Sequence, residues 1–323
     1  MLKKIFWLAA CAIAFVMAPE ATQAQTWPTK SIRMIVPYPA GGLSDTFARL
    51  IGDKLGQKLG QSIVIDNRPG GNTIIGTQAT AQSAPDGYTL LLTNGSLSIN
   101  QSLVTNLPYN LDMDLAPVIW LGESYGLIFV NNNVAAKTLP ELVKLAQEKP
   151  GQMSIAVPGL GTNYRIALEQ MKEITGAQFI MVPYKGSPPA IADVLGGQVQ
   201  AGIDSLVPLA PHVKAGKLRA LAVMSVARTP DLPDLPTTAE AGLPELVIYG
   251  YNAIMAPGGT PRPIVDKVNA AVNEILAEPD TIARARVLGL RLGGGSPEVL
   301  KQTIDKVTDI YARVIKSANI KPE

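Results

Sequence analysis

Short apolar segments alternate with amphipathic helical patterns near the start of the chain. Strands are predicted at Ile32–Val36, Ile63–Ile65 and Tyr88–Leu92, and helices at Thr46–Leu59 and Ile74–Gln82. Parallel strands need a long crossover connection, which is usually a helix. This alternation therefore predicts an α/β fold in which helices cover a parallel sheet.

A second series of strands and helices fills the rest of the chain, whose 323 residues are enough for two domains. A segment rich in Pro, Asp and Thr at 228–244 is predicted to be a connection. The strands are expected at Leu127–Val130, Met153–Val157, Phe179–Val182, Val199–Ile203, Leu218–Met224 and Leu246–Met255, and the helices at Thr138–Glu148, Tyr164–Ile174, Pro188–Leu195, Ile264–Leu276 and Pro297–Ala318.

The N-terminal residues have the pattern of an export signal. Lys3 and Lys4 precede the apolar stretch Ile5–Ala18, and the small residues Thr22 and Ala24 predict cleavage after Ala24. A membrane anchor is the alternative, but the stretch is short of the about 20 residues that span a bilayer.

Cys11 is the only cysteine and would leave with the signal, so neither a disulfide nor thiol chemistry is expected in the mature chain. Lipid attachment at a Leu8–Cys11 box is a further alternative, although that box lies inside the apolar stretch. The formal net charge is +2, without a basic stripe, which argues against nucleic acid as a partner. The mature product is expected to be soluble and exported.

A Pro- and Gly-rich elbow joins the first predicted strand to its helix. Backbone N–H groups at a helix N-terminus attract anions, and this elbow holds no Lys, His or Cys that would react with one. Its residues are Tyr38, Pro39, Ala40, Gly41 and Gly42, with Asp45 at the start of the helix.

A similar elbow, Gly159–Asn163, follows the strand Met153–Val157. Its Gly-x-Gly start resembles a dinucleotide fingerprint, but Tyr164 stands where the third glycine is required. Gly161, Thr162 and Asn163 are therefore candidates for binding an anion, and an ordinary tight turn with a good helix cap is the alternative.

Four other polar residues are candidate ligand contacts because they follow predicted strands or begin a helix. Asn94 and Ser96 could contact a ligand or form an ordinary Asn-Gly turn. Arg165 could pair with a ligand carboxylate or with Glu169. Asp204 could accept from a ligand or cap a turn.

Sequence patterns of enzymes are weak. His212 is the only histidine and is expected at a surface helix position, so no histidine cluster for zinc is possible. The Gly71–Thr77 segment has the glycine spacing of a phosphate loop but lacks its lysine, and we expect it to lead into a helix and line a cleft. We expect no catalytic residue, metal or cofactor.

Several motifs occur in a fixed order along the mature chain. They are Trp27–Arg33, Val36–Gly42 with Asp45, Ile65–Gly71, Ala84–Leu90, Val182–Gly186, Leu195–Val199 and Gly216–Ala222. Together they resemble the Bug/TctC family, the extracytoplasmic solute receptors of tripartite tricarboxylate transporters.

The resemblance implies the fold of type II periplasmic binding proteins, with two doubly wound α/β lobes joined by a two-crossing hinge. We expect lobe 1 at residues 25–124 and 249–323 and lobe 2 at 125–248. The resemblance also implies that Tyr38–Gly42 and Gly161–Arg165 hold the two ends of a small carboxylate. Its partners would be the large and small membrane components of the transporter, and we expect a monomer.

Arg165 departs from the family pattern, in which many members have His at this position. A permanently charged, forked side chain suits a second carboxylate, so a dicarboxylate, aliphatic or aromatic, is the expected ligand. The sequence thus predicts a periplasmic receptor that delivers such an acid to a transporter. The alternatives are a sensory co-receptor of the same fold and an exported hydrolase or lyase that uses Asp45 and Asp204.

Overall fold

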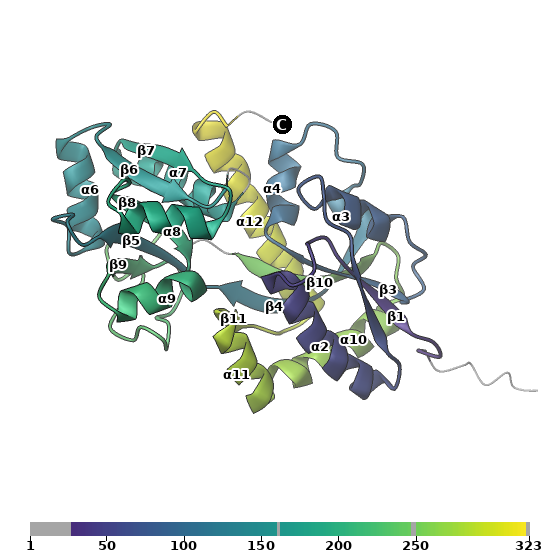
Figure 1. Ribbon diagram of the computed structural model, residues 1–323. Coiled ribbons are helices and arrows are strands. Elements are labelled where there is room, and N and C mark those ends of the chain that lie inside the picture. The colour runs from purple at the N-terminus through teal and green to yellow at the C-terminus, as the bar shows by residue number, and fades with distance from the viewer. Residues whose placement is uncertain (1–26, 160–161, 247–249, 321–323) are drawn as a thin grey trace, which may run out of the picture.

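The computed structural model describes residues 27–159, 162–246 and 250–320. Within these ranges the chain forms two β-sheets that lie side by side, each with helices packed against it (Figure 1). The predicted export signal and its predicted cleavage site after Ala24 lie outside the described residues. Of the helices within these ranges, none is both long enough and apolar enough to cross a membrane.

The first sheet has the order β11-β4-β10-β3-β1-β2. β1 pairs in parallel with β2 and β3, whereas β10 is antiparallel to both β3 and β4. The predicted parallel sheet is therefore a mixed one. Its strands are β1 (Ile32–Val36), β2 (Ile63–Asn67), β3 (Thr89–Asn94), β4 (Leu115–Ser124), β10 (Tyr251–Pro257) and β11 (Leu290–Leu292).

The second sheet has the order β7-β6-β8-β5-β9 and repeats the directions of the first. β6 pairs in parallel with β7 and β8, and β5 is antiparallel to β8 and β9. Its strands are β5 (Gly126–Asn131), β6 (Met153–Val157), β7 (Phe179–Pro183), β8 (Ala201–Ser205) and β9 (Leu218–Val223).

The chain passes between the two sheets twice, and each passage supplies an antiparallel strand. β4 ends at Ser124 in the first sheet, and β5 begins at Gly126 in the second. After β9 the chain returns to form β10, which lies between β3 and β4. Each sheet is thus completed by a strand that arrives from the other (Figure 1).

Apolar side chains are buried on both faces of each sheet, which explains why the helices of each half divide into two layers. α12 contacts α4 and β4 of the first half and α7 of the second, so it lies along the boundary (Figure 1). The helices are α2 (Leu43–Leu59), α3 (Ile74–Ala81), α4 (Ser96–Leu103), α5 (Leu111–Asp114), α6 (Leu139–Glu148), α7 (Asn163–Thr175), α8 (Ser187–Leu195), α9 (Leu206–Lys214), α10 (Arg262–Leu276), α11 (Pro279–Val287) and α12 (Pro297–Ser317).

Most predicted elements are present with small shifts of their ends. β1 and β6 have the predicted bounds, and Thr138 caps α6 by accepting a hydrogen bond from the Glu141 backbone N–H. The sequence did not indicate β4, β11, α4, α5 or α11, and within α9 it indicated only a helical position for His212. β4 was missed because it contains Gly122 and Glu123, which neither the helical nor the strand pattern of apolar residues marks as buried. Its pairing with β10 is also irregular.

Glu123 connects three segments at the junction between the sheets. Its side chain is 2% exposed, and Oε1 accepts hydrogen bonds from Arg291 Nε on β11 and Ser225 Oγ after β9, each at 2.9 Å. β4, β11 and the return to β10 therefore meet at one carboxylate. A buried acceptor shared by two donors is expensive to remove, because the donors lose their partner as well.

We expect Glu123→Ala to lower the free energy of unfolding by about 2 kcal/mol, because two charge-assisted contacts are lost from a buried position. Glu123→Gln keeps an acceptor oxygen and should cost less. Urea denaturation measures both changes. Glu148→Ala, which removes an exposed contact to Lys144, is the control, and an equal effect of the two alanine variants would contradict the junction role.

Candidate functional site

A cavity of about 350 Å³, here called the cleft, lies where segments of the two sheets meet. Among its lining residues that the structure describes, none carries a charged side chain. They are Tyr38, Leu43, Ser44, Asn72, Asn94, Gly95, Ser96, Ile99, Ser124, Thr162, Asn163, Tyr164, Gly250, Tyr251 and Asn252.

Three helices begin at the cleft. The first residues of α2, α4 and α7, or the residues just before them, belong to the lining. In the described part of the chain, no side chain caps the N-termini of α2 and α7 by a hydrogen bond, whereas at α4 the Ser96 backbone N–H donates to Asn94 Oδ1. The unsatisfied N–H groups and the positive ends of the helix dipoles therefore make the cleft attractive to an anion without any cationic side chain.

Asp45, which is buried at 3% exposure, stabilises the elbow before α2 by hydrogen bonds. Asp45 Oδ2 accepts from the Gly41 backbone N–H at 2.8 Å, and Oδ1 accepts from Asn67 Nδ2 at 3.0 Å. Arg49 pairs with the same carboxylate at 3.0 Å. Burial opposes ionisation, but the hydrogen bonds from Arg49, Gly41 and Asn67 outweigh it and keep the pKa of Asp45 below its ordinary value.

The amide of Asn94 has a fixed orientation at the start of α4. The Ser96 backbone N–H donates to Asn94 Oδ1 at 2.9 Å, so Nδ2 is left as a donor at the cleft. The Asn-Gly turn expected as an alternative is therefore present together with a cleft position. Two tyrosines beside it stay neutral, because burial raises the pKa of both Tyr38 and Tyr251.

Five of the residues predicted from sequence line the cleft: Tyr38, Asn94, Ser96, Thr162 and Asn163. Others lie close to it without being part of the lining. Pro39, Ala40, Gly41 and Gly42 form an exposed loop between the lining residues Tyr38 and Leu43, and Asp45 lies behind that loop. Gly161 lies outside the described residues. Contact of any of these residues with a ligand stays a prediction.

Arg165 and Asp204 are not in the cleft lining. Arg165 is half-buried in the first turn of α7, and Glu169, its proposed partner, contacts Lys172 at 2.8 Å. Asp204 is 1% exposed, and its Oδ1 accepts from Ser187 Oγ and from the Ser205 backbone N–H. These contacts fit the capping alternative, and burial raises the pKa of Asp204.

Apart from Tyr164, which lies within the range Gly161–Arg165 that the resemblance assigned to one end of the ligand, the remaining lining residues were not selected from the sequence as ligand contacts. Asn72 belongs to the Gly-rich segment for which a cleft position was expected, so a signal for it existed. Ser124, Gly250 and Asn252 come from the two passages between the sheets, where no local pattern marks a site. The rest are Leu43, Ser44, Gly95, Ile99, Tyr164 and Tyr251.

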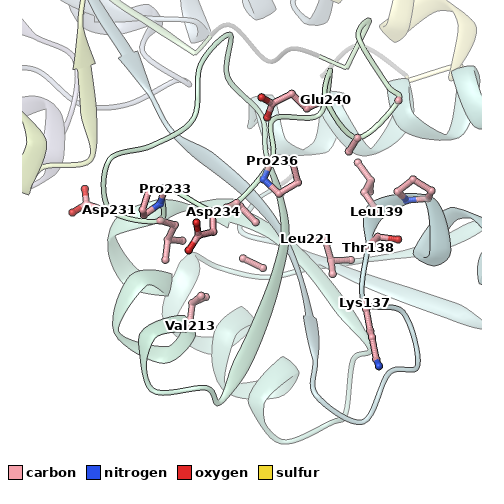
Figure 2. A pocket seen from close by; sticks show the side chains of 16 residues that line it. Lys137, Thr138, Leu139, Val213, Leu221, Asp231, Pro233, Asp234, Pro236 and Glu240 are labelled. Atoms are coloured by element: carbon pink, nitrogen blue, oxygen red, sulfur yellow. The ribbon is translucent and has the colours of Figure 1, made fainter.

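A larger cavity of about 820 Å³ lies at the β9 edge of the second sheet (Figure 2). It is lined only by residues between 137 and 242, with Leu221 at its centre and Asp234 and Lys137 on opposite sides (Figure 2). No segment of the first sheet and no start of α2, α4 or α7 reaches it. The smaller cleft is therefore the candidate ligand site.

Two sheets with corresponding strand directions, two passages between them and a cleft at their junction are the architecture expected of a two-lobed solute-binding receptor. The sequence profile of the tripartite tricarboxylate transporter family receptor, TctC, matches residues 47–319. The chain belongs to this family, whose members are receptors and not enzymes, so the hydrolase or lyase alternative is wrong. The predicted α/β fold with two sheets is confirmed.

Three solved structures of the family are similar to this chain. The periplasmic binding protein BugD is 30% identical with a TM-score of 0.74, covering 92% of this chain and 100% of its own. Rpa4515 of R. palustris, solved with adipate, is 34% identical with a TM-score of 0.77 and the same coverage. MatC of Rhodopseudomonas palustris, solved with malate, is 30% identical with a TM-score of 0.72 over 90% of this chain and 100% of its own.

We expect Asp45→Asn to destabilise the protein by about 2 kcal/mol at neutral pH, because charge-assisted hydrogen bonds to the elbow are weakened. The lowered pKa of Asp45 means that its contribution is present above its ordinary pKa and is lost as the pH falls through the folded-state value. The two proteins should therefore converge in stability at acidic pH.

Denaturant titrations at several pH values measure this difference. Asp266→Asn is the matched control, because Asp266 forms an exposed i, i+4 pair with Arg262 and should change stability little. A constant gap between wild type and Asp45→Asn down to low pH would show that the carboxylate charge does not hold the elbow.

Proposed function

We propose that this protein is a periplasmic receptor that binds a small dicarboxylate in the cleft and delivers it to a membrane transporter. One observation carries the proposal: a cleft whose described lining residues carry no charged side chain, and at which three helices begin, two of them, α2 and α7, without side-chain caps. The family to which the chain belongs, and relatives solved with adipate and malate, support a carboxylate as the ligand.

The cleft suits a carboxylate for physical reasons. Backbone N–H groups at the starts of α2 and α7 point along the helix axes and are already oriented before a ligand arrives. Asn94 Nδ2 and the hydroxyl groups of the lining add neutral donors. Such donors stabilise an anion with little reorganisation, and they come from both sides of the cleft, so a ligand with a carboxylate at each end would use both.

The strand arrangement supports the division into lobes. All strands of the first sheet fall within residues 25–124 and 249–323, and all strands of the second fall within 125–248. We propose these ranges as lobe 1 and lobe 2. The export signal, with cleavage after Ala24, supports a periplasmic location for the mature protein.

A thermal-shift screen of mono-, di- and tricarboxylates tests the proposal. A ligand that binds only the folded state and is added at about 100 times its Kd should stabilise the protein by about 2.7 kcal/mol. We expect dicarboxylates such as succinate or adipate to do so and the neutral diamides of the same acids to have no effect. If no carboxylate stabilises the protein more than its diamide, the proposal fails.

The affinity for the acid should be constant between about pH 6 and 8. No Asp, Glu, Lys or His lines the cleft within the described ranges, and burial raises the pKa of Tyr38, Tyr164 and Tyr251 further above neutral. Calorimetric titrations at several pH values measure this invariance.

Arg165→Ala distinguishes a direct ion pair from a distant effect. Because Arg165 does not line the cleft, we expect its removal to weaken dicarboxylate binding less than about tenfold, which corresponds to about 1.4 kcal/mol. Arg219→Ala is the control, because Arg219 bonds the carbonyl groups of Val134 and Ala136 in the second lobe. A loss of several hundredfold for Arg165→Ala alone would restore the direct carboxylate pair expected from the sequence.

A further inference from the structure

An unusual backbone segment forms one wall of the cleft. Four consecutive residues have positive φ angles: 122° at Gly70, 54° at Gly71, 49° at Asn72 and 76° at Thr73. A β-branched residue such as Thr73 rarely adopts this conformation, which persists only when the surroundings enforce it. Asn72 lines the cleft, and α3 begins directly after this segment.

Asn100 on α4 enforces this conformation. It is completely buried, and its Nδ2 donates to the Asn72 backbone carbonyl at 2.8 Å and to Thr73 Oγ1 at 3.4 Å. Asn72 Nδ2 in turn donates to Asn100 Oδ1 at 2.7 Å. The two asparagines thus form a pair of reciprocal hydrogen bonds between α4 and the wall of the cleft.

The network determines which end of the Asn72 amide is free. A backbone carbonyl can only accept, so the end of Asn100 that faces it must be the NH₂ group. Asn100 Oδ1 then faces Asn72 and requires a donor, which must be Asn72 Nδ2. No hydrogen bond from the described residues reaches Asn72 Oδ1, so an acceptor of fixed orientation is left on a residue of the cleft lining.

We propose that Asn72 Oδ1 is a specificity-determining acceptor that favours carboxylates bearing a hydroxyl group, and that Asn100 is its positioning residue. A carboxylate oxygen cannot donate to this atom, so a plain diacid leaves it unpaired on desolvation. Asn94 Nδ2 supplies the complementary donor for a carboxylate oxygen. This inference rests on the proposed function, since it refines which acid the same cleft prefers.

A hydroxyl group fits this acceptor better than an ammonium group does. An ammonium ion loses its hydration in the cleft, and no lining carboxylate in the described ranges replaces it. Neutral Asn72 Oδ1 offers one hydrogen bond, which satisfies a hydroxyl group but leaves a charged amine without a counter-ion. A hydroxy-diacid is therefore expected to bind more tightly than either the unsubstituted acid or the amino acid of the same length.

The experiment compares affinities within two series by calorimetry: succinate, malate and aspartate, and glutarate, 2-hydroxyglutarate and glutamate. We expect the hydroxy acid to bind about tenfold more tightly than its parent acid in at least one series. In Asn72→Gly the ratio should fall to about one, because glycine keeps the positive φ and removes only the acceptor. Asn319→Gly, at an exposed residue with φ of 50° after α12, is the control and should retain the ratio.

Asn100→Asp tests the positioning role. An aspartate cannot donate to the Asn72 carbonyl, so we expect the hydroxyl preference to be lost although residue 100 does not line the cleft. The ratio of two affinities is the readout, because a general loss of stability would lower both affinities together. The inference is overturned if Asn72→Gly still prefers the hydroxy acid. It is also overturned if the wild-type protein binds the parent acids without preferring the hydroxy acids. Neither result affects the proposed function. If none of the six acids binds, the inference fails, whereas the proposed function fails only if the wider carboxylate screen also finds no ligand.

Discussion

Parallel strand pairing within each sheet is the constraint on which the binding site depends. β1 pairs in parallel with β2 and β3, and β6 pairs in parallel with β7 and β8. Because parallel strands end at the same edge, the helices that follow them also begin there. α2 follows β1, α4 follows β3 and α7 follows β6, so three helix N-termini meet at the cleft. The anion affinity that we propose for the cleft would therefore follow from strand direction.

The exchange of strands between the sheets completes the site. Counted from β2 in the first sheet and from β7 in the second, β10 and β5 both occupy the fourth position, and each is reached by a passage from the other sheet. These passages carry Ser124, Gly250 and Asn252 into the cleft lining, and Glu123 fixes the same junction from within. The segments that connect the lobes therefore also form the floor on which a ligand would rest.

The sequence predicted the features that depend on local chemistry. Both elbows, the bounds of β1 and β6, and the cap of α6 follow from neighbouring residues alone. The motif Val-Pro-Tyr occurs at the ends of two strands, at Val36–Tyr38 and at Val182–Tyr184, but these two strands are not counterparts in the two sheets. Val182 and Pro183 are the last residues of β7, which corresponds in sheet order to β2, whereas the counterpart of β1 is β6, which is followed by Pro158 and Gly159. Tertiary pairing decides such correspondences, as it decides the burial of β4.

Arg165 does not line the cleft, and its pairing with a ligand carboxylate stays a prediction. A cation in the first turn of a helix opposes the dipole, and from this an anionic partner was expected. An ion pair in a dry cleft must repay the desolvation of both charges, whereas helix N–H groups are desolvated and oriented when the protein folds. The positive potential of such groups attracts any small acid alike. Discrimination between acids then falls to neutral side chains with fixed donors and acceptors, and in this cleft Asn72 and Asn94 have orientations set by their own hydrogen bonds.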